Sequence, residues 1–74
     1  MTLEQLSIGD RAHITAVEGN DSMRSRMFAL GLRRGREVAM IRKAARNGPL
    51  QVRVGSTDVI LRRREARRVR LDPA

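Results

Sequence analysis

Short apolar runs separated by turn signals recur along the whole chain, and this pattern limits its fold more than any other feature. Ala12, Ile14 and Ala16 alternate with polar residues, in the period of a half-buried strand. Adjacent apolar residues in 37–43 predict a strand that is either buried on both faces or bent around a barrel. By these criteria we expect strands at residues 11–17, 37–43, 50–54, 57–61 and 69–71.

A helix of about three turns is expected after the first strand, because the period changes there. Three apolar residues recur at i, i+4 and i+7 on one helical face, namely Met23, Met27 and Leu30. Asp21 or Ser22 can cap the helix N-terminus, and Gly31 stands where a helix C-terminus needs a left-handed residue. A second helical turn, or a charged turn, is expected at residues 62–67.

The chain has 74 residues and no cysteine, so residues 1–74 are expected to form one small domain without disulfides or a thiolate zinc site. Five short strands in so short a chain cannot make two well-filled sheets. A small closed β-barrel is the economical way to remove sheet edges. There is no apolar run near the ~18 residues of a membrane span and no signal peptide pattern, so we expect a cytoplasmic protein.

The charge is strongly basic, with 16 cations against 8 acids and a formal net charge of +8. Residues 42–74 hold ten of the cations but only three acids, which predicts attraction to an anionic surface such as nucleic acid, lipid or an acidic protein face. Four arginines, together with neighbours at 68 and 70, form either a solvated rim or a docking rim for an acidic or membrane-proximal partner: Arg62, Arg63, Arg64 and Arg67.

Several segments, in order and at matching spacing, carry a resemblance to a known family. They are residues 6–9, 23–27, 30–32, Gly35 before a strand, 48–54 and 61–66. Across residues 3–71 the chain resembles the ferrous iron transport protein A family, FeoA. The resemblance implies a mainly β fold, an SH3-like β-barrel with one inserted helix. It also implies a free-standing accessory of FeoB, the membrane Fe(II) transporter with a GTP-hydrolysing domain.

What the resemblance implies about function is a non-enzymatic cytoplasmic protein, without a cofactor, that binds and modulates the FeoB-type transporter and reaches the inner membrane through it. The apolar stripe of the helix has two interpretations: it packs the helix on the barrel, or it lines an aliphatic groove for the partner. In the second, Met27 is at the centre of the contact, with Met23, Phe28, Leu30 and Leu32 around it.

The alternative function is a basic single-barrel module that binds RNA or the ribosome. Stacking platforms for single-stranded RNA depend on aromatic residues, and Phe28 is the only one in the chain, so specific nucleic-acid binding is not expected.

His13, the only imidazole, is either a solvent-facing spacer or a weak surface metal ligand. The acids that could assist it are Asp10, Glu18, Asp21 and Asp58. A dedicated Fe(II) site is not expected, and a divalent metal bound there would be adventitious.

Overall fold

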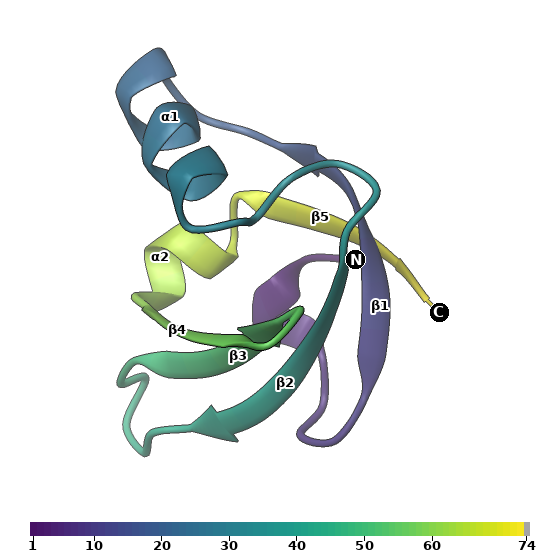
Figure 1. The fold of residues 1–74 in the computed structure, drawn as a ribbon. Helices are drawn as coiled ribbons and strands as arrows, with labels where there is room; N and C mark the ends of the chain where they lie inside the picture. Colours follow the sequence, from purple (N-terminus) through teal and green to yellow (C-terminus); the bar gives the residue numbers. More distant parts are fainter. Residues whose placement is uncertain (74) are drawn as a thin grey trace.

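The computed structural model describes residues 1–73, which form short strands and a few small helices (Figure 1). The elements in chain order are the 3-10 helix η1 (Leu3–Gln5), β1 (Arg11–Val17), α1 (Asp21–Ala29), β2 (Glu37–Lys43), β3 (Leu50–Val54), β4 (Thr57–Leu61), α2 (Arg63–Ala66) and β5 (Val69–Pro73). The mainly β class, the five strands and the inserted helix are confirmed, and α2 is the expected short helical turn. No pattern in the sequence indicated η1.

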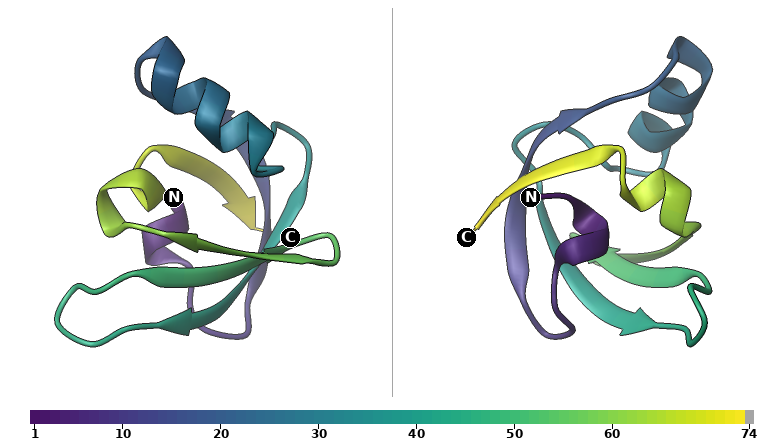
Figure 2. Two further views of the ribbon diagram at one scale, coloured as in Figure 1. Left: turned by 60° about the vertical axis from the view of Figure 1, so that its left-hand side comes forward. Right: turned by 180° about the vertical axis from the view of Figure 1, so that it is seen from behind.

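The five strands form one antiparallel sheet in the order β4-β3-β2-β1-β5, and the sheet curls around a core (Figure 2). The pairing of β2 with β3 shifts register between Met40 and Arg42. This shift is a β-bulge, which bends β2. Val38 and Met40 are buried while Ile41 is half-buried. The bent interpretation of residues 37–43 is therefore correct, and burial on both faces is not observed.

The barrel is partly open, which differs from the closed barrel expected. In the described part of the chain, β4 and β5 are the two ends of the sheet and do not pair with one another. The short helix α2 spans the opening between them, and η1 lies inside the curve of the sheet (Figure 2). Every element contributes to one core of buried apolar side chains, the largest of which are Leu3, Leu6, Ile14, Met27, Leu32, Met40, Leu50 and Leu61.

Both ends of α1 are closed by capping interactions. The side chain of Asn20 accepts a hydrogen bond of 2.9 Å from the Met23 N–H, so Asn20 is the N-cap and the expected Asp21 or Ser22 is not. At the other end Gly31 has φ +93°, and its N–H donates to the Phe28 carbonyl over 3.0 Å. The next N–H donates to the Met27 carbonyl over 2.9 Å. This pair of bonds is a Schellman motif, which confirms the expected left-handed glycine.

Candidate docking surface

The apolar stripe of α1 is divided between core and surface. Met27 is fully buried in the core and Leu32 is 1% exposed, so neither side chain can be the centre of an open partner groove. For Met27 the packing interpretation is correct, because α1 lies against one end of the barrel (Figure 2) and this side chain belongs to the core. Of the predicted partner-binding residues, Met23 and Leu30 are half-buried and Phe28 is exposed.

Phe28 presents an aromatic ring at the C-terminal end of α1, with 58% of the residue exposed. The guanidinium carbon of Arg33 lies 4.2 Å from the ring centroid, which is a cation–π geometry. The Nε of Arg33 also donates a 3.4 Å hydrogen bond to the Phe28 carbonyl. One large apolar side chain and one cation are thus held together on the surface.

An open groove of about 490 Å³ runs between the C-terminal end of α1 and β4. On the helix side its walls include Ala29, Leu30 and Gly31, and on the sheet side they include the consecutive residues 57–60. Three arginines also line it, namely Arg26, Arg33 and Arg36. The sequence predicted a groove along the apolar stripe of the helix, but of the residues predicted to line it only Leu30 borders this one. The wall formed by β4 was not predicted, because β4 and α1 are distant in the chain and no local pattern reports that they face each other.

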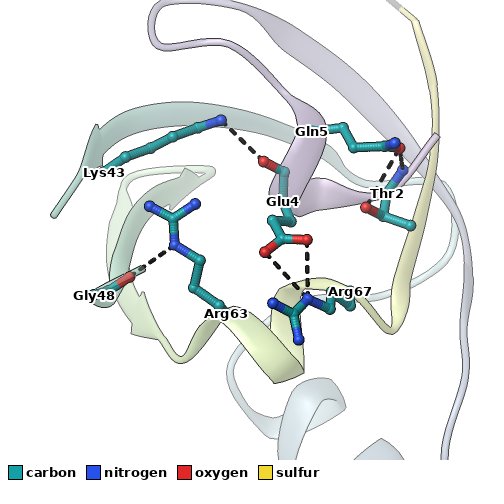
Figure 3. Close-up of polar contacts among 7 residues, drawn as sticks. All are labelled: Thr2, Glu4, Gln5, Lys43, Gly48, Arg63 and Arg67. Atoms are coloured by element: carbon teal, nitrogen blue, oxygen red, sulfur yellow. Dashed lines mark hydrogen bonds and ion pairs between the residues drawn. The ribbon is translucent and has the colours of Figure 1, made fainter. Parts of the chain in front are cut away.

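The predicted basic rim contains two arginines that make structural contacts (Figure 3). The Nε of Arg63 donates a 3.0 Å hydrogen bond to the Gly48 carbonyl, and the residue is half-buried. The Nε of Arg67 lies 3.0 Å from the Glu4 carboxylate, which joins α2 to η1. Arg62 and Arg64 are exposed. Arg63 and Arg67 thus also help to hold the fold, and the docking role of the rim stays a prediction.

Glu65 has a structural role that the sequence pattern did not indicate. It is 6% exposed, and its Oε1 accepts a 2.9 Å hydrogen bond from the Arg62 N–H at the start of α2. Its other carboxylate oxygen pairs with Arg26 of α1. A buried carboxylate needs such partners. The available signal was a single acid within a run of arginines.

Asp58 is bound on the outer face of the sheet, directly across from Arg53 in the β3–β4 pairing. Its carboxylate accepts hydrogen bonds of 2.7 and 3.1 Å from Arg53 and one of 2.9 Å from Gln51. The hydrogen bond from Arg53, followed by the one from Gln51, lowers the pKa of Asp58 below its ordinary value. Asp58 is thus held as a carboxylate and is already partnered.

His13 is exposed and lies opposite Glu37 in the β1–β2 pairing, with 4.0 Å between Nε2 and the carboxylate. None of the four acids expected to assist the histidine is paired with it. In residues 1–73 no three His, Cys, Asp or Glu side chains gather into a group that could hold a metal ion. His13 with Glu37 is at most a two-ligand surface site, whereas structural zinc almost always has four ligands.

None of the helices in residues 1–73 has the length and apolar character needed to span a membrane.

Comparison with solved structures identifies the fold. FeoA from Chlorobium tepidum is 33% identical with a TM-score of 0.91, and the match covers 99% of this chain and 70% of that one. FeoA from Stenotrophomonas maltophilia, solved with zinc and described as a procaryotic SH3 domain protein, is 38% identical with a TM-score of 0.84. That match covers 97% of this chain and 89% of the other. The expected SH3-like fold is confirmed.

A manganese-dependent transcriptional repressor is 15% identical with a TM-score of 0.91, covering 100% of this chain and 41% of the repressor, and shares the fold alone. The Fe(2+) transport protein A/Fe(2+) transporter FeoB fusion protein of Porphyromonas gingivalis is 31% identical over 72 residues. This match covers 97% of the chain but only 8% of the fusion protein. The FeoA domain model matches residues 1–73. The chain therefore belongs to the FeoA family.

Proposed function

We propose that this chain is a non-enzymatic accessory protein that binds a FeoB-type Fe(2+) transporter from the cytoplasmic side and modulates its activity. The observation that carries the proposal is the Porphyromonas gingivalis relative, in which a FeoA-like segment and FeoB are one polypeptide. Covalent linkage holds two modules at a high effective concentration, which is useful when they act on each other.

The exposed end of α1 is the proposed centre of the contact. Phe28 and Arg33 lie together there, and aromatic residues and arginine are the types most often dominant in interface energetics. Leu30, which lines the groove with Arg33, and Met23, in the first turn of α1, are half-buried and would add apolar area. The exposed Arg62 and Arg64 would mainly raise the association rate with an acidic face. Met27 and Leu32 would support the surface from the core.

The test is capture of the FeoB-type transporter from detergent-solubilised native membranes by the immobilised chain. We expect the wild type to retain the transporter and Phe28→Ala to weaken retention about tenfold or more, as truncation of a central aromatic does. The matched control is Ile8→Ala, because Ile8 is 60% exposed, much like Phe28, and lies in the loop before β1.

The outcomes separate the two parts of the proposal. Failure of the wild type to retain the transporter would refute the proposed partner. Equal loss in Phe28→Ala and Ile8→Ala would leave the partner standing and refute the proposed contact. Where the complex forms, GTP hydrolysis and Fe(2+) uptake measured with and without the chain report the modulation.

A further inference from the structure

The outer edge of β4 is an unpaired strand edge. The two-residue turn Gly55-Ser56 joins β3 to β4, with Val54 paired to Thr57, and Gly55 has φ +62° as a type II′ hairpin turn requires. Antiparallel pairs alternate between hydrogen-bonded and non-hydrogen-bonded from this closing pair. The backbone groups of Asp58 and Ile60 therefore point away from β3. In residues 1–73, no backbone hydrogen bond outside the β3–β4 pairing reaches residues 57–61.

The opposite edge of the sheet is covered, which makes the open edge of β4 distinctive. The Leu71 N–H of β5 donates a 2.7 Å hydrogen bond to the Met1 carbonyl, and the Met1 amino group lies 3.3 Å from the Leu71 carbonyl. Thr2 and Arg70 add an isolated bridge. Natural sheets usually protect their edges from further pairing, either with charged side chains or with a covering segment such as this one. β4 instead exposes 59% of Ile60.

The surroundings of this edge are cationic. The groove beside it is lined by Arg26, Arg33 and Arg36, and its only carboxylate, Asp58, is already bound by Arg53. Among the described residues Arg33 and Arg36 form no ion pair with an acid. An occupant of the groove would therefore meet unneutralised positive charge and two apolar contacts, Leu30 and Ile60.

We propose that the free edge of β4 binds an extended acidic segment of a partner protein, which adds to the sheet as a further strand. Main-chain hydrogen bonds to Asp58 and Ile60 would supply affinity, as in other cases of strand addition. Carboxylates on the added strand would face Arg33 and Arg36, and alternate apolar side chains would contact Ile60. The identification of the segment as part of a FeoB-type transporter rests on the proposed function above, but the site itself does not.

Two other occupants are disfavoured by the same observations. A second copy paired edge to edge would bring its own Arg33 and Arg36 against those of the first, and like charges in one interface are costly. A nucleic-acid strand would gain from stacking on aromatic side chains. Phe28 is the only aromatic residue, and Arg33 already lies over its ring.

The experiment uses the blocked peptide Glu-Val-Glu-Val-Glu-Val-Glu as a probe, titrated into the isotope-labelled chain and followed by amide NMR shifts. We expect a dissociation constant below about 1 mM, with the largest shifts at residues 57–61 and slowed amide exchange at Asp58 and Ile60. The matched probes are the Lys-Val peptide of equal length and the Glu-Val peptide with N-methylated backbone. Both should bind at least about tenfold more weakly. The Lys-Val peptide lacks the negative charge that the arginines attract, and the N-methylated peptide lacks the backbone N–H donors of an added strand.

Two pairs of variants test the edge and the charge separately. Ile60→Pro removes an outward N–H, which an edge strand tolerates, while Ile60→Val keeps it. Arg36→Glu reverses one charge in the groove, while Arg46→Glu makes the same change at the tip of the β2–β3 hairpin. We expect Ile60→Pro and Arg36→Glu each to weaken probe binding about tenfold. Ile60→Val should weaken it clearly less than Ile60→Pro, because it keeps the N–H and most of the apolar side chain, and Arg46→Glu should leave it unchanged. If Ile60→Pro does not fold, the Arg36 and Arg46 pair decides the matter.

The proposal is overturned if the Glu-Val probe does not bind, if the Lys-Val or N-methylated peptide binds equally, or if the shifts lie away from β4. Tighter binding of an oligouridine than of the probe, or dimerisation of the chain abolished by Ile60→Pro, would also overturn it. The proposed function fails separately: probe binding without transporter capture refutes the transporter as partner, whereas capture that survives Ile60→Pro and Arg36→Glu refutes the role of β4 in it.

Discussion

The Nε of Arg63 donates a hydrogen bond of 3.0 Å to the carbonyl oxygen of Gly48, fifteen positions earlier in the chain. Its Nη2 donates a second, of 3.1 Å, to the Ala44 carbonyl. One guanidinium on α2 thus fastens both ends of the β2–β3 loop (Figure 3 draws the bond to Gly48). Arg63 was expected to be an exposed rim residue. The geometry makes it a tie between α2 and the sheet.

Arg63→Ala should therefore lower the free energy of unfolding by more than about 1 kcal/mol, because partly buried carbonyls lose a charged donor. Arg63→Lys should recover only part of it, since an ammonium cannot reproduce the planar fork. The control is the neighbouring Arg64→Ala, which is exposed and should stay within about 0.5 kcal/mol. Urea denaturation of the variants measures the difference, and equal stability of Arg63→Ala and Arg64→Ala would contradict the tie.

Met27→Asp should unfold the domain, because Met27 is 0% exposed. Burial of an unpaired carboxylate costs several kcal/mol, which is comparable to the whole stability of a small domain. Met27→Leu keeps the volume and apolar character and should cost less than about 1.5 kcal/mol. Circular dichroism on both variants checks this, and a folded Met27→Asp protein would show that the side chain can reach solvent.

Two glycines should resist substitution for different reasons. Gly31 has φ +93°, and an added Cβ would meet nothing closer than 3.7 Å, so Gly31→Val should cost more than about 1 kcal/mol through backbone strain alone. Gly31→Asn should cost less, because asparagine tolerates the left-handed region. An added Cβ on Gly48 would lie 2.7 Å from the Ala44 Cβ, so Gly48→Ala should lower stability through this steric clash instead. Melting temperatures that do not distinguish Gly31→Asn from Gly31→Val would refute the conformational explanation.

Stability should fall at acid pH partly through Asp58, whose pKa is lowered chiefly by the Arg53 hydrogen bond and then by Gln51. A carboxyl group with a lower pKa in the folded state stabilises the fold above its unfolded pKa of about 3.9, and that contribution disappears as pH falls through the folded pKa. Wild type and Asp58→Asn should therefore differ in stability by a constant amount near neutral pH and converge below about pH 4. A difference that persists undiminished at low pH would contradict this assignment.

Nucleic-acid binding should be weak despite the net charge of +8. We expect dissociation constants no tighter than about 10⁻⁶ M at physiological salt, with a steep loss of affinity as salt rises. No sequence preference is expected, because contacts would be to phosphates. Fluorescence anisotropy with several labelled RNAs over a salt series measures both quantities. A tight, salt-resistant complex with one RNA would favour the alternative function.

The strands and the inserted helix could be predicted from the sequence because their signals are local. Alternation in residues 11–17 and 50–54, and a glycine after the last periodic residue of the helix, each report the conformation of their own segment. The same logic shows why the fate of Met27 stayed open. Periodicity tells which side chains share a helix face, but it does not tell how much of that face the barrel covers.

The contacts between distant segments could not be predicted in the same way. The Arg63 tie, the Glu65 pair with Arg26 and the groove along β4 all join residues far apart in the chain. A run of arginines in the sequence does not show which of their side chains are exposed and which make contacts within the fold. In the loop between β2 and β3 positive φ falls on Arg46 and Asn47, whereas Gly48 is needed for close packing against Ala44.

The bridge between Thr2 and Arg70 also sets a kinetic constraint. The strand that covers one side of the barrel, β5, is the last of the five strands described, and it must pair with both β1 and the first residues before the sheet is complete. Contacts of such long sequence separation slow folding, since loop-closure entropy is lost before they form. During synthesis, the apolar side chains of the first four strands that β5 covers would stay exposed until β5 leaves the ribosome.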